Sequence, residues 1–129
     1  QVNFGHFIIH ALGARYHTPH GELCGVVLPY LAEFCTKYMS AEMAQIARII
    51  GIDPAAENFG AEMAEKIRVF VRGTGLRSLA GCGSPKEEVL EMTEMMYGGF
   101  QSSRATASCM KQAPKAEFTH FIEKIASDQ

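Results

Sequence analysis

Apolar residues recur at helical spacing along most of this chain of 129 residues. Between residues 21 and 38 they follow the i, i+3, i+4, i+7 pattern of one helical face over several turns. Residues 2–12 are apolar nearly all round, which is typical of a central, buried helix. No stretch shows sustained alternation of apolar and polar residues, so the pattern predicts an all-α fold.

The same periodicity predicts four further helices, which makes a bundle of about six. They are expected at residues 40–50, 55–72, 85–97 and 115–127. Ser84 and Glu87 form a capping-box pattern around Pro85, and Gly98-Gly99 is expected to end that helix. The residues expected to face the core from the second and fourth of these helices are Phe59, Met63, Ile67, Phe70 and Val71, and Phe118, Phe121, Ile122 and Ile125.

Composition is that of a globular domain. Hydrophobic residues make up 47% and charged residues 20%, and the net charge of −2 gives no footprint for nucleic acid or an anionic membrane. The apolar runs are too short to span a bilayer, and the start lacks the pattern of a signal peptide, so cytoplasmic residence is the default expectation. The four cysteines have no CxxC spacing, and Cys24 and Cys35 fall on apolar helical positions, so they are expected to be reduced core residues.

Four of the five histidines lie between Gly5 and Gly21. His6 and His10 are one helical turn apart on the same face. Gly13 is expected to end that helix, Pro19 to mark the turn, and His20 to open the next helix. Imidazoles from two segments would then converge, which is the geometry that a metal site needs.

A structural role for these histidines stays open, because buried histidines are often only satisfied core residues. The pattern HxxxH is weak by itself and lacks the glutamate of HExxH. His17 is the poorest ligand candidate, since it lies in the loop, and His120 is expected on the surface of the last helix.

The residues also carry a family resemblance. His6-x3-His10, the Y-H-T-P-H-G turn at residues 16–21 and the Leu28-Pro29-Tyr30 segment resemble the iron-containing alcohol dehydrogenase family, in the region that begins its C-terminal helical domain. The segment 44–52 is similar to a helix of that family. The resemblance implies the C-terminal domain of the two-domain architecture shared with dehydroquinate synthase.

In that family the positions of His6 and His20 bind the catalytic metal, Fe(II) or Zn(II), and the position of His10 lies beside the substrate and the nicotinamide, where it is expected to assist proton movement. The resemblance implies an NAD(P)-dependent enzyme acting on a small alcohol or aldehyde. An aspartate and a histidine from a preceding nucleotide-binding domain would complete the metal site, and that domain would bind most of the NAD(P).

This chain would then be a single all-α metal-binding domain over residues 1–129, with the nucleotide-binding domain outside it. It starts without a methionine, which suggests that upstream sequence has been removed. Gly73-Thr74-Gly75 gives only part of a dinucleotide loop. The isolated chain is therefore expected to be inactive, and assembly into a homo-oligomer is left open.

Two alternatives remain at this point. Asn3-Phe4-Gly5-His6 and His20-Gly21-Glu22 also resemble dehydroquinate synthase, for which a basic phosphate site would be expected. The other alternative is a non-catalytic helical module with structural histidines. In that case losing His6 or His20 would change stability but not metal affinity.

Overall fold

The structure is a computed structural model that describes residues 4–104, 106 and 108–128. Its seven α-helices within these residues are α1 (Phe4–Tyr16), α2 (His20–Tyr38), α3 (Ser40–Ile49), α4 (Phe59–Gly73), α5 (Lys86–Glu91), α6 (Thr93–Ser102) and α7 (Lys115–Ala126). Two short 3-10 turns, Ala80–Cys82 and Met110–Gln112, are the other regular elements described. The predicted all-α fold is confirmed. The predicted start of the first helix at Val2 lies outside the described residues.

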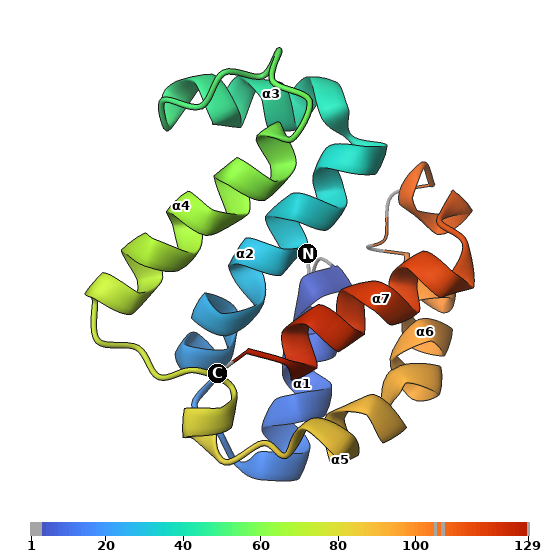
Figure 1. The fold of residues 1–129 in the computed structure, drawn as a ribbon. Coiled ribbons are helices and arrows are strands. Elements are labelled where there is room, and N and C mark those ends of the chain that lie inside the picture. Colours follow the sequence, from blue (N-terminus) through green and yellow to red (C-terminus); the bar gives the residue numbers. More distant parts are fainter. Residues whose placement is uncertain (1–3, 105, 107, 129) are drawn as a thin grey trace.

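Helix α2 is the centre of the arrangement. It contacts α1, α3, α4 and α7, and α1 and α4 flank it (Figure 1). Helix α3 crosses the far end of α2 and α4, while α5, α6 and α7 close the bundle around α1. None of the helices in the described ranges is both long and apolar enough to cross a membrane.

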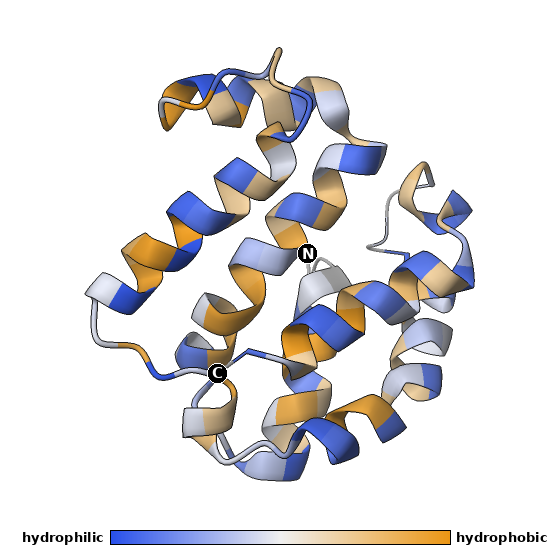
Figure 2. Ribbon diagram, in the orientation of Figure 1, coloured by the Kyte–Doolittle hydropathy of each residue, from blue (hydrophilic) through white to orange (hydrophobic). Residues whose placement is uncertain are grey.

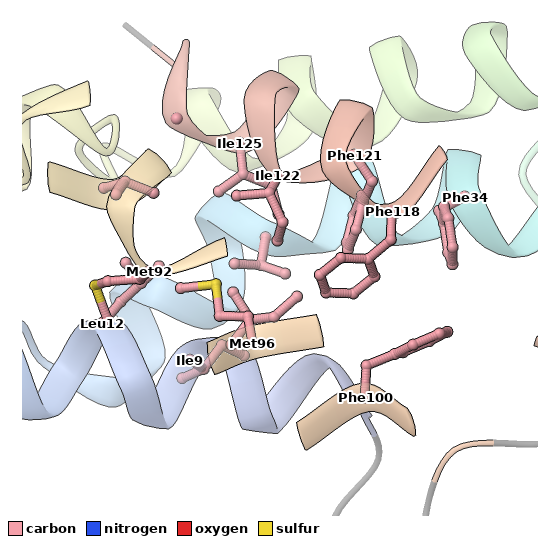
Figure 3. Packing of buried hydrophobic residues seen from close by; sticks show 14 of the residues in the cluster. Ile9, Leu12, Phe34, Met92, Met96, Phe100, Phe118, Phe121, Ile122 and Ile125 are labelled. Carbon is pink, nitrogen blue, oxygen red and sulfur yellow. The ribbon is translucent and has the colours of Figure 1, made fainter. Parts of the chain in front are cut away.

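The main core lies between α1, α2, α6 and α7. Figure 3 shows Ile9 and Leu12 of α1 facing Ile122 and Ile125 of α7, with Met92 and Met96 filling the space between them. Beside them is an aromatic cluster made of Phe34, Phe100, Phe118 and Phe121, with neighbouring ring centroids 4.7–6.2 Å apart. All four residues predicted to face inward from the last helix are buried, so that prediction is confirmed.

Two glycines allow helices to approach each other closely. A Cβ atom at Gly60 of α4 would overlap Thr36 of α2, and one at Gly99 of α6 would overlap the ring of Phe7 of α1. The prediction that Gly98-Gly99 ends a helix was therefore wrong, because α6 runs through both residues to Ser102. Gly99 serves packing against α1 rather than helix termination.

The predicted helix over 85–97 is interrupted. The N–H of Met92 donates to the carbonyl of Val89, a 3-10 type bond that breaks the regular ladder and separates α5 from α6. The capping box also does not form. Pro85, with an extended ψ of 136°, occupies the N-cap position, so Ser84 lies one residue too early to cap the helix.

Helix α4 differs from its prediction in two respects. It begins at Phe59 rather than Ala55, because Asp53 Oδ1 accepts the N–H of Ala55 at 2.9 Å and holds the preceding residues in a turn. Phe70 was expected in the core but is 74% exposed. The buried face that α4 presents to α2 passes through Met63 and Val71, and Phe70 lies outside it. Figure 2 shows that hydrophilic and hydrophobic residues follow one another along α4.

Two phenylalanines offer a matched test of this packing. Phe118 has 0% exposure and Phe70 has 74%. We expect Phe118→Ala to lower the free energy of unfolding by about 3–5 kcal/mol, because it removes a ring from the aromatic cluster. Phe70→Ala should change it by no more than about 0.5 kcal/mol. Urea unfolding measures both, and similar losses in the two variants would contradict the assigned core.

Candidate metal centre

Three histidine rings meet where α1 packs against α2. His6 and His10 lie one turn apart on α1, and His20 is the first residue of α2. The ring centroid of His20 lies 5.3 Å from that of His6 and 5.5 Å from that of His10. The centroids of His6 and His10 are 6.0 Å apart. Imidazoles from two segments are therefore gathered at one place. Their roles as ligands and proton carrier stay predictions.

A tight reversal between α1 and α2 produces this arrangement. His17 has a left-handed φ of 53°, and its N–H donates to the carbonyl of Gly13 at 2.9 Å, which caps the end of α1. Gly13 itself does not end the helix as predicted, because α1 continues to Tyr16. A glycine inside a helix costs only about 1 kcal/mol, which packing readily offsets.

Cys24 lies close to two of the histidines, His6 and His20. It lies one turn after His20 on the same face of α2. The ligand atoms of His6, His20 and Cys24 all lie within 4.8 Å of one another. Cys24 is free, as expected from the sequence, but it is half-buried rather than a full core residue, and its apolar position concealed that it lies beside the two histidines. The spacing His20-x3-Cys24 is the signal in the sequence that could have revealed it.

The three side chains fit a divalent ion. Atoms at this separation surround a point at most about 2.8 Å from each, and zinc bonds to nitrogen and sulfur are about 2.0–2.3 Å long. Small side-chain rotations would therefore bring all three within bonding distance. Imidazole nitrogen suits both iron and zinc, while thiolate sulfur favours zinc.

The first turn of α2 is tied to the loop before α5. Glu22 Oε2 accepts hydrogen bonds from Arg77 Nε at 3.0 Å and Nη2 at 2.7 Å, and from the Cys82 thiol at 3.2 Å. The Arg77 guanidinium, helped by the thiol, holds the pKa of Glu22 below its ordinary value. The contacts of Glu22 thus fix the start of the helix that carries His20 and Cys24.

A hollow of about 400 Å³ adjoins the histidines, and its lining includes His10, His17, Thr18 and His20. Thr18 is buried, and its Oγ1 has no hydrogen-bond partner within the described part of the chain. His17 is exposed at the edge of this hollow. His120 lies apart on α7, is exposed, and has its Nδ1 3.3 Å from Glu123 Oε2, which confirms its prediction as a surface residue.

Comparison with known proteins identifies the family. A model described as "Fe-containing alcohol dehydrogenase family, C-terminal" matches residues 1–125. The chain belongs to this family and represents its C-terminal domain. Of the two families that the sequence resembles, the iron-containing alcohol dehydrogenases are therefore confirmed and dehydroquinate synthase is not.

One curated relative is maleylacetate reductase of Burkholderia cepacia. The two proteins are 32% identical over 89 residues, which cover 69% of this chain and 23% of the reductase. The matched part is thus about a quarter of the length of that relative. No solved structure gives a significant match.

The contribution of Glu22 predicts a pH-dependent effect on stability. Because its folded pKa is lowered, the carboxylate stabilises the fold above the ordinary glutamate pKa of about 4.3, and the contribution is lost as pH falls towards the lowered value. We expect Glu22→Gln to lower the free energy of unfolding at pH 7, and the difference from wild type to close in acid. Urea unfolding at several pH values measures it.

Glu57→Gln is the control for this experiment, because it removes the same charge from an exposed turn. A constant difference between wild type and Glu22→Gln at every pH would show that the Arg77 contact does not depend on the Glu22 charge.

Proposed function

We propose that this chain is the metal-binding helical domain of an NAD(P)-dependent alcohol dehydrogenase, in which His6 and His20 hold a divalent ion, Fe(II) or Zn(II). The observation that carries the proposal is the convergence of their ligand atoms from two helices, in a chain that belongs to the iron-type family. When bound, the ion would polarise the oxygen of an alcohol or carbonyl substrate for hydride transfer.

The hollow beside the histidines is where a small alcohol or aldehyde would bind. His10 lines it with an exposed imidazole, a group that can pass a proton between a substrate oxygen and water. The relative that is a maleylacetate reductase supports an oxidoreductase activity on a small organic molecule.

The remaining parts of the active site belong to a second domain in this proposal. Two imidazoles leave positions open on a metal ion, and catalytic sites normally have at least three protein ligands. The nucleotide-binding domain that precedes this region in the family would supply further ligands and most contacts to NAD(P). The match to 23% of the reductase supports a larger whole protein.

Metal titration tests the proposal directly. Fe(II) and Zn(II) are titrated into the purified chain by calorimetry under anaerobic conditions. We expect the His6→Ala, His20→Ala double variant to lose more than about 100-fold in affinity, since changes at groups that only support ligands already cost about 10–100-fold. His120→Ala is the matched control, because His120 is an exposed histidine on another helix. Equal affinities in wild type and the double variant would leave the histidines with a structural role.

The isolated chain is expected to be catalytically inactive, because the nucleotide site and part of the ligand set lie in the second domain. Oxidation of short alcohols and reduction of aldehydes, each followed by the absorbance of NADH or NADPH, should give no rate above the uncatalysed background. Turnover at the level of an intact dehydrogenase would contradict the assignment of a half-site.

A further inference from the structure

We propose that Cys24 is a third metal ligand from this chain, so that the ion is bound by two imidazole nitrogens and one thiolate sulfur. The inference rests on the proposed function, because it concerns the same ion. It goes further in assigning a sulfur ligand, and with it a preference of this half-site for zinc over iron.

The position of Cys24 is set by helix geometry. His20 and Cys24 are separated by one turn of α2, so their side chains project from the same face. His6 reaches them from α1, and the three ligand atoms lie within 4.8 Å of one another. The three proposed ligands therefore come from two helices, α1 and α2.

The helix beneath these ligands is firmly held. Leu23, Val26 and Val27, in the same turns of α2, are each no more than 2% exposed, and Cys24 itself packs against the edge of this core. A ligand set built on packed helices keeps its geometry better than one built on loops. His20 and Cys24 are therefore arranged for a metal before it binds.

The chemistry of this set is that of a catalytic zinc site. Two nitrogens and one sulfur give three protein ligands and leave a fourth position for water or substrate. On binding, the Cys24 thiol releases its proton to solvent and its sulfur donates an electron pair to the ion, with no change of oxidation state. With three ligands the chain can bind zinc without help from a second domain.

Cobalt(II) provides the test, because it occupies zinc sites and gives a sulfur-to-metal charge-transfer band in the near ultraviolet only when a thiolate is bound. We expect the band in the wild-type chain, its loss in Cys24→Ser, and its retention in Cys35→Ser. Cys35 is the matched control, since it is a half-buried cysteine three turns further along the same helix. Circular dichroism checks that each variant is folded.

A second measurement needs no variant. Alkylation of the wild-type chain by iodoacetamide, followed by mass spectrometry, should be at least ten-fold slower at Cys24 when zinc is present, while the exposed Cys109 should react at an unchanged rate. Alkylation of Cys24 at the same rate with and without zinc would overturn the proposal, whatever the variants do.

The outcomes separate this inference from the proposed function. Cobalt binding that needs His6 and His20 but gives no charge-transfer band would remove Cys24 from the ligand set and leave the histidine site in place. A charge-transfer band that persists in Cys24→Ser would also remove Cys24 from the ligand set, because another thiolate would then be the source of the band. No cobalt binding by the wild-type chain would overturn both proposals together.

Discussion

The packing of α1 against α2 is the constraint on which the rest of the histidine site depends. Helix α1 buries Ile8, Ile9 and Leu12, and the tight reversal at His17 leaves it little freedom to slide along its neighbour. A shift of one helical turn would move α1 by about 5.4 Å, as far as the 5.3 Å that separates the rings of His6 and His20, and would take His6 away from His20. The hydrophobic core therefore determines the register of the polar site. The placement of His6 and His20 beside each other is therefore a consequence of core packing.

Helix α2 serves two purposes through its different faces. Its buried residues join the main core on one side and the smaller cluster with Met43 and Met63 on the other. His20 and Cys24 lie in its first two turns, Cys24 at the edge of the main core, and the contact of Glu22 with Arg77 fixes this helix start. The central helix of the bundle thus carries His20, which is exposed, and Cys24, which is half-buried. This explains how a domain of modest size can offer an ordered site beside an open hollow.

Much of the fold could be predicted from the sequence, because helical periodicity is a local property. The helices ending at Tyr38 and Ile49 and the buried face of α7 follow directly from it. The exposure of Phe70 could not be predicted, because it depends on which neighbours cover α4. For the same reason Cys24 looked like a core residue: its contact with His6 arises only when two helices pack. The histidine cluster was accessible to sequence reasoning because its members are close along the chain.

The ligand set implied by these residues connects this domain with the one that would complete it. The family resemblance implies an aspartate and a histidine from the preceding domain, which with the proposed ligands His6, His20 and Cys24 would make five donors. A catalytic zinc ion has at most about five ligands when the substrate oxygen is bound, which leaves four positions for the protein, so sulfur and carboxylate would compete for one of them. Zinc would favour the thiolate of Cys24, whereas Fe(II) would favour the harder carboxylate oxygen. The metal that occupies the assembled site would then decide whether Cys24 is bound or released, and a single change at this position would move the balance between the two metals.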